Sequence, residues 1–133
     1  MANIINFSDA ASIGIHSMIL IAKSEIPINA IQLSKVLGNS KHHIGKVLQR
    51  LVKDGFLSSY RGPTGGFYME ADPKTTTLYD IYESIEGKSN LKLCPDDKHI
   101  CPVDKCVKKK VVKRLSDEFE IYMKSQKLIE YIQ

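Results

Sequence analysis

The strongest structural signals of this chain lie in QLSKVLGNSKHHIGKVLQRLVKDGFLSSYRGPTGGFY, residues 32–68. Apolar residues at helical spacing precede Gly38-Asn39, a pair that interrupts the pattern and indicates a tight turn. Ser40 is a residue type that caps helix N-termini, and Gly55 is typical of the left-handed residue that follows a helix. The segment therefore predicts two helices joined by a short turn, over residues 28–37 and 40–54.

The second of these helices has one apolar and one polar face. Its apolar residues follow the spacing i, i+3, i+4 and i+7 and are Ile44, Val47, Leu48 and Leu51. Two helices joined in this way place the second, the recognition helix, in the major groove of DNA. The polar face offers cations and hydrogen-bond donors for phosphates and base edges, and the candidates are Ser40, Lys41, His42, His43, Lys46, Gln49 and Arg50.

A strand-loop-strand wing is predicted directly after the recognition helix. Residues 56–60 alternate as a strand, residues 61–66 form a glycine- and proline-rich turn, and residues 67–69 return as a second strand. Glycines at the tip allow backbone to approach a phosphate or a groove closely, so Gly62, Gly65 and Gly66 are candidate DNA contacts. Arg61 is expected to enter the minor groove, where narrow width concentrates negative potential.

A family resemblance rests on this wing and on the helix that follows it. The stretch LVKDGFLSSYRGPTGGF, residues 51–67, resembles the winged helix-turn-helix of the Rrf2 family of bacterial transcription regulators. The stretch TLYDIYESIEG, residues 77–87, resembles the next helix of that family. The resemblance implies a sequence-specific regulator of transcription, expected to be a repressor. Such a regulator would bind an inverted-repeat operator in double-stranded DNA as a homodimer, because dimer symmetry matches a pseudo-palindrome.

The remaining segments predict further helices and a mainly α fold with a small β wing. An apolar first helix is expected over residues 10–22, a third helix over 78–86, and a long amphipathic helix over 102–124. The long helix either packs on its own domain or pairs with a second subunit, and the Rrf2 resemblance implies a dimerisation helix. Apolar residues 128–132 are expected to dock on the partner subunit or on the first helix.

We expect three parts: a winged helix-turn-helix domain over residues 1–87, a cysteine loop over 88–101, and a dimerisation helix with its tail over 102–133. The net charge of +4 is weak evidence for nucleic acid, but its distribution says more. Residues 32–68 hold six basic residues against one acidic residue, although a solvated helix face would also account for this. A cytoplasmic protein without membrane contact is expected, because neither a signal peptide nor a membrane span is recognisable.

Three cysteines lie close together, at Cys94, Cys101 and Cys106. In a cytosolic protein an odd cysteine count indicates metal or redox chemistry, not a disulfide framework. Neighbouring lysines favour the thiolate form, which suits an anionic iron–sulfur cluster of the [2Fe–2S] or [4Fe–4S] type. Cluster-binding Rrf2 regulators usually have the cysteine spacing C-x5-C-x5-C before the dimerisation helix. In this chain the first and last cysteines keep the same total span, and the middle cysteine is displaced by one residue. Candidates for a fourth ligand are Asp9, Ser12, His16 and His99.

Other interpretations stay open for the cysteines and for the whole chain. The cysteines would also suit metal-free sensing through sulfenic acid or a disulfide, a zinc site, or no role at all. With a cluster or reactive thiols, the regulator would respond to oxidants, nitric oxide or iron–sulfur status. A small redox or metal-binding interaction protein is the alternative from another class. An enzyme is not expected, because the sequence has no nucleophile–base pair, phosphate-binding loop or paired carboxylates at a useful spacing.

Overall fold

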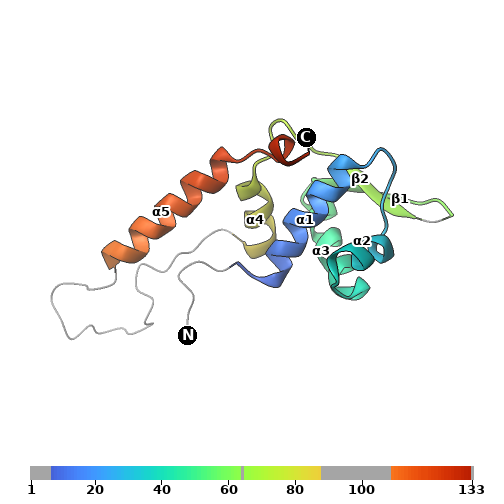
Figure 1. Ribbon diagram of the computed structural model, residues 1–133, viewed down its shortest axis with the longest axis horizontal. Helices are drawn as coiled ribbons and strands as arrows, with labels where there is room; N and C mark the ends of the chain where they lie inside the picture. Colours follow the sequence, from blue (N-terminus) through green and yellow to red (C-terminus); the bar gives the residue numbers. More distant parts are fainter. Residues whose placement is uncertain (1–6, 64, 88–108, 133) are drawn as a thin grey trace.

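The computed structural model describes residues 7–63, 65–87 and 109–132 and has the predicted fold, mainly helical with a two-stranded wing (Figure 1). The elements in chain order are α1 (Asp9–Lys23), α2 (Ala30–Leu37), α3 (Lys41–Lys53), β1 (Leu57–Tyr60), β2 (Gly66–Met69), α4 (Leu78–Glu86), α5 (Lys109–Ser125) and the 3-10 helix η1 (Leu128–Tyr131). The boundaries of α3 and α4 agree with the sequence expectation, and residues 102–108 of the predicted long helix lie outside the described residues.

The start of α2 differs from the prediction. We expected the helix to begin at Ile28, but it begins at Ala30 because Asn29 caps it. The side chain of Asn29 accepts from the backbone N of Gln32 at 2.8 Å, and the side chain of Gln32 accepts from the backbone N of Asn29 at 2.9 Å. Ile28 is extended and exchanges two backbone hydrogen bonds with Phe67 of β2, at 3.1 and 2.8 Å. The linker before α2 is therefore joined to β2 by one antiparallel bridge.

The wing is a short antiparallel hairpin anchored by one buried leucine. β1 and β2 pair in a register that sets Leu57 opposite Met69 and Tyr60 opposite Gly66. Leu57 is buried at the base of the hairpin, so this end of the wing is fixed to the core. At Gly66, φ is +148° and an added Cβ would lie 2.9 Å from Cβ of Pro27, so only glycine fits beside the linker.

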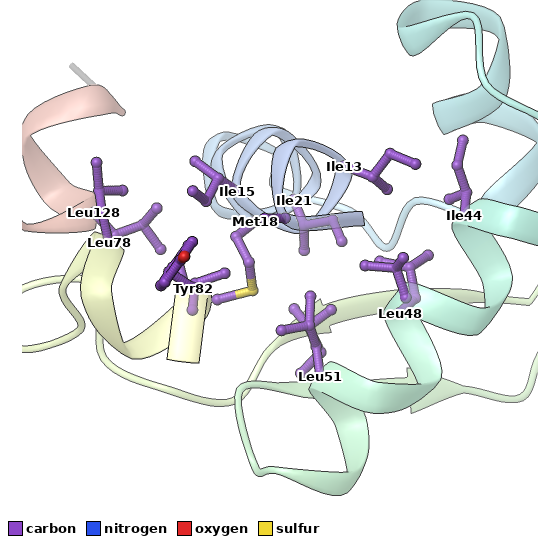
Figure 2. Packing of buried hydrophobic residues seen from close by; sticks show 14 of the residues in the cluster. Ile13, Ile15, Met18, Ile21, Ile44, Leu48, Leu51, Leu78, Tyr82 and Leu128 are labelled. Carbon is purple, nitrogen blue, oxygen red and sulfur yellow. The ribbon is translucent and has the colours of Figure 1, made fainter. Parts of the chain in front are cut away.

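The hydrophobic core surrounds α1 and determines how α3 is oriented. Figure 2 shows Met18 and Ile21 of α1 between Tyr82 of α4 and the two α3 residues Leu48 and Leu51. These side chains are at least nine-tenths buried. Burying one large apolar side chain stabilises a protein by roughly 1.5–3 kcal/mol, so the apolar face of α3 is firmly attached to α1.

The C-terminal tail docks on its own domain. Leu128 is fully buried in the core, and η1 packs against α1, which agrees with one of the two expected docking places. Backbone hydrogen bonds hold the tail to the segment before α4: the N of Leu78 donates to the O of Gln126, and the N of Leu128 to the O of Thr76, both at 2.9 Å. The tail thus fixes the C-terminal end of α5 to the start of α4.

α5 extends from this junction away from the body of the protein (Figure 1). Near its C-terminal end, Phe119 packs edge-on against Tyr82 at 5.1 Å between ring centroids, and Met123 is buried in the core. The ammonium group of Lys124 lies 5.0 Å from the ring centroid of Tyr79. Within the described residues, no helix is both long and apolar enough to cross a membrane.

Candidate nucleic-acid interface

The solvent-facing side of α3 carries a row of cations and hydrogen-bond donors. His42, Lys46, Gln49 and Lys53 follow the spacing i, i+4, i+7 and i+11 and are all exposed. The opposite face is buried against α1, so this row points away from the protein. Such side chains can contact phosphate oxygens and base edges without any change in the core.

The first turn of α3 is formed by the predicted cap. The hydroxyl of Ser40 accepts from the backbone N of His43 at 3.2 Å, which satisfies one of the free N–H groups at the helix start. Ser40, Lys41 and His42 are exposed, and His43 is partly buried. The positive end of the helix dipole lies at this turn and favours a phosphate there.

Gly45 is a feature of this face that the sequence analysis missed. It lies in the middle of α3, between the exposed residues His42 and Lys46, and an added Cβ would have no described atom within 4 Å outside its own helix. A glycine in a helix interior costs about 0.5–1 kcal/mol relative to alanine. A mid-helix glycine on a polar face was the available signal, because glycine permits close approach of another surface to the helix backbone.

Arg50 differs in direction from the other predicted DNA contacts. Its Nε donates to the backbone O of Ser84 in α4 at 3.0 Å, and also lies 3.4 Å from Oδ2 of Asp54. Half of the Arg50 side chain is exposed, with a relative exposure of 52%. The described structure therefore places the guanidinium at the edge of the exposed row, against α4.

The tip of the wing presents Arg61 to solvent. A hydrogen bond from the N of Gly65 to the O of Gly62, 3.1 Å long, closes the turn at the tip. The ring of Tyr60 crosses Gly62 so closely that an added Cβ would lie 2.3 Å from its Cε1. Gly62 and Gly65 are partly exposed, whereas Gly66 is buried against the linker before α2. The structure thus gives Gly66 a packing role.

The candidate metal ligands are only partly described. Cys94, Cys101, Cys106 and His99 lie outside the described residues. Asp9 and His16 are exposed on α1 at the spacing i, i+7, so they share one face of that helix. Within the described residues, no group of three or more His, Cys, Asp or Glu side chains could hold a metal ion.

Comparison with known protein families finds a match over nearly the whole chain. The model of the Rrf2 family, described as an iron-dependent transcriptional regulator, matches residues 7–133. This chain belongs to the Rrf2 family. The sequence resemblance is therefore confirmed, and so is the expectation that the chain is not an enzyme, because the matching family consists of transcriptional regulators.

Individual Rrf2-type relatives are similar to this chain over part of their own length. The chain is 29% identical to the transcriptional regulator NsrR of Bacillus subtilis over 76 residues, covering 56% of this chain and 52% of NsrR. It is 24% identical to the regulator IscR of Photorhabdus laumondii over 108 residues, covering 81% of this chain and 66% of IscR. This chain thus spans about half the length of NsrR and about two thirds of IscR.

Solved structures show the same fold over nearly the whole chain. CymR, the global cysteine regulator of B. subtilis, superposes with a TM-score of 0.77 at 22% identity, covering 96% of each chain. IscR of T. potens superposes with a TM-score of 0.74, also at 22% identity, covering 94% of this chain and 84% of the other. At this level of identity the similarity establishes the winged-helix fold of this Rrf2 member.

Proposed function

We propose that this Rrf2 protein is a homodimeric transcription regulator that binds an inverted-repeat operator through α3 and the wing. The observation that carries this proposal is the exposed row of cations and donors on α3, a helix whose other face is buried against α1. A rigid helix with such a face suits the major groove. Family membership supports the same role.

The proposed DNA contacts divide into two groups. Ser40, Lys41, His42, His43 and Lys46 contact the major groove and its flanking phosphates. Arg61, with the backbone of Gly62 and Gly65, contacts the minor groove or the phosphate backbone beside it. Two helical turns of α3 and one wing tip form a contact surface on each subunit, and a two-fold dimer presents two of them to two half-sites.

The proposed dimer forms through α5. Val111, Leu115 and Tyr122 are exposed at the spacing i, i+4 and i+11 and form one apolar stripe along the helix. Beside this stripe, the inward side chains Phe119 and Met123 already pack on their own domain. An exposed apolar stripe on a projecting helix suits the same stripe of a second copy, because an isologous interface uses one surface twice.

The proposed input is a chemical change at Cys94, Cys101 and Cys106. Three thiolates are soft ligands that suit iron–sulfur clusters, so these residues would hold a [2Fe–2S] or [4Fe–4S] cluster, with Asp9, His16 or His99 as candidates for a further ligand. When bound, the cluster would supply a group that oxidants or nitric oxide can alter. The iron-dependent description of the family supports a cluster over direct oxidation of the thiols, which is the second candidate.

Purification without oxygen tests the sensing part of the proposal. Visible absorption, iron and acid-labile sulfide are measured on the wild-type chain and on the variant with all three cysteines changed to alanine. We expect coloured protein with stoichiometric iron and sulfide from the wild type, and colourless protein from the variant. Colourless wild-type protein whose thiols react with peroxide would instead support metal-free sensing.

Salt dependence of DNA binding tests the regulator itself. The wild-type protein selects a duplex from a random-sequence pool, and its affinity for this duplex is measured from low to high salt. A protein that neutralises phosphates loses affinity with a slope of about 0.9 per phosphate contact on a double-logarithmic plot. We expect Lys46→Ala to reduce this slope, while Lys74→Ala, an exposed lysine in the turn before α4, leaves the slope unchanged. A flat salt dependence for the wild type would contradict the proposed function.

A further inference from the structure

A small closed network of polar contacts joins Arg50 to the end of α4. The Nε of Arg50 donates to the backbone O of Ser84 at 3.0 Å and lies 3.4 Å from Oδ2 of Asp54. The hydroxyl of Ser84, a buried residue, donates to the same carboxylate oxygen of Asp54. Groups from the C-terminal ends of α3 and α4 thus hold one another in place.

The carbonyl that receives the Arg50 hydrogen bond lies at the negative end of a helix. α4 ends at Glu86, so the O of Ser84 belongs to its last turn, where the backbone carbonyls carry partial negative charge. A guanidinium held here is favoured by the helix dipole, and its charge strengthens the hydrogen bond. Because Arg50 belongs to α3, this cap on α4 comes from another helix.

The direction of Arg50 separates it from the exposed row on α3. That row consists of His42, Lys46, Gln49 and Lys53. The next positions around the helix are Arg50 and then the buried residues Val47 and Leu51. Arg50 lies on the border between the two faces, and its charge is directed to α4 and partly compensated by Asp54. The Nε–H of Arg50 is thus used within the protein and is not available to a phosphate.

We propose that Arg50 is a positioning residue, which sets the direction of the recognition helix by capping α4, and that it does not bind phosphate. This inference rests on the proposed DNA-binding function and revises the sequence expectation for Arg50. The apolar face of α3 packs against α1, and the Arg50 network adds a directional polar contact to α4. Without that contact α3 loses one restraint on its direction relative to α4, and a small shift of the helix misaligns base contacts but leaves the attraction of the phosphates unchanged.

Substitutions at Arg50 and at Lys46 distinguish positioning from phosphate binding. Two duplexes serve as probes: the one that the wild type selects from a random pool, and a random-sequence duplex of equal length. Arg50→Ala removes both charge and donor, whereas Arg50→Lys keeps a charge suited to phosphate but lacks the Nε–H that donates to the backbone O of Ser84. Lys46→Ala is the matched control from the exposed row of the same helix.

For a positioning residue we expect three results. Arg50→Ala lowers affinity for the selected duplex about tenfold, which corresponds to roughly one charge-assisted hydrogen bond. Its salt slope equals that of the wild type, while Lys46→Ala loses a slope of about 0.9 for each phosphate contact. Arg50→Lys behaves like Arg50→Ala, and the double variant Asp54→Asn, Ser84→Ala also loses preference for the selected duplex. The proposal is wrong if Arg50→Ala loses slope as Lys46→Ala does and Arg50→Lys restores binding, or if Arg50→Ala binds like the wild type.

A measurement without DNA keeps this inference separate from the proposed function. In the nitrogen-15 NMR spectrum we expect the Nε–H of Arg50 to exchange slowly with water in the wild type. This protection should weaken in the double variant Asp54→Asn, Ser84→Ala, which removes the carboxylate network but keeps the backbone acceptor, and it should persist in Lys46→Ala. A rapidly exchanging Nε–H in the wild type would overturn the capping role even if DNA binding is established. A protected Nε–H together with salt-independent binding would contradict the proposed function and leave the capping contact in place.

Discussion

Gly14 of α1 lies so close to α4 that an added Cβ at this position would be 3.1 Å from Cγ1 of Ile85. The same Cβ would be 3.6 Å from Cγ1 of Val47 in α3, so three helices meet at this glycine. Gly14 itself is buried. The separation of the three helices is therefore set by the absence of a side chain here, and the recognition helix is one of the three.

Gly14→Val is expected to lower the free energy of unfolding by about 1–3 kcal/mol, because branches on Cβ would overpack the contact with Ile85 and Val47. Urea denaturation followed by circular dichroism measures the change. The matched control is Gly45→Val, a substitution in another helix where no described atom outside that helix lies within 4 Å of the added Cβ. Equal stability losses in the two variants would show that Gly14 has no special packing role.

Gly45→Ala is expected to have opposite effects on folding and on DNA binding. Alanine should raise the free energy of unfolding by about 0.5–1 kcal/mol, since glycine is the poorer residue in a helix interior. The added methyl group lies beside His42 and Gln49, at one edge of the proposed DNA contact surface, so affinity for the selected duplex should fall. Thermal unfolding and a binding titration on the same preparation give both values. A more stable variant with unchanged affinity would exclude close approach of DNA at this position.

Leu115→Asp is expected to convert the proposed dimer to a monomer, because it places a charge in the exposed apolar stripe of α5. Sedimentation equilibrium over a range of protein concentrations gives the association state. Ile121→Asp is the control, because Ile121 is even more exposed, at 69%, but lies outside the stripe formed by Val111, Leu115 and Tyr122. Two variants that remain dimeric would place the interface elsewhere, and two monomeric variants would point to general damage to the helix.

Stability at high pH should depend on Tyr82. Burial raises the pKa of Tyr82, and the nearby groups Glu86 and Tyr79 raise it further. The native state then holds this proton at pH values where the unfolded chain, with an ordinary tyrosine pKa of about 10, has released it. Its contribution to stability is complete below about pH 10 and is lost as the pH rises through the raised pKa of the folded state, with a slope of at most about 1.4 kcal/mol per pH unit.

Tyr82→Phe tests this dependence, since the ring contact with Phe119 can be kept while the titrating hydroxyl is removed. The free energy of unfolding is measured between neutral pH and alkaline pH for both proteins. We expect the wild type to lose stability more steeply above pH 10 than the variant. Parallel curves would mean that the pKa of Tyr82 is the same in the folded and unfolded states.

Much of the fold followed from local sequence. Three features depend only on residues within one or two helical turns: the cap at Ser40, the glycine at the end of α2 (Gly38) and the apolar face of α3. They could therefore be predicted without knowledge of the rest of the chain. The wing could also be predicted, because its turn residues and its two strands are neighbours in the sequence. These local signals also identified His42, Lys46 and Gln49 of the exposed row, but not Lys53.

Contacts between distant segments were decided by the tertiary structure. Ile28 pairs with the wing sheet because the fold brings it next to Phe67, which lies far along the chain. The backbone N–H and C=O groups of the two residues then form hydrogen bonds with each other. From the sequence, Arg50 was predicted to be one more cation on the DNA-facing side of the recognition helix. In the structure its Nε donates instead to the backbone O of Ser84 at the end of α4 and points away from the exposed row. The positive charge and helical spacing were set by the sequence alone. The direction in which that charge points depended on which backbone groups the fold brought within hydrogen-bonding distance.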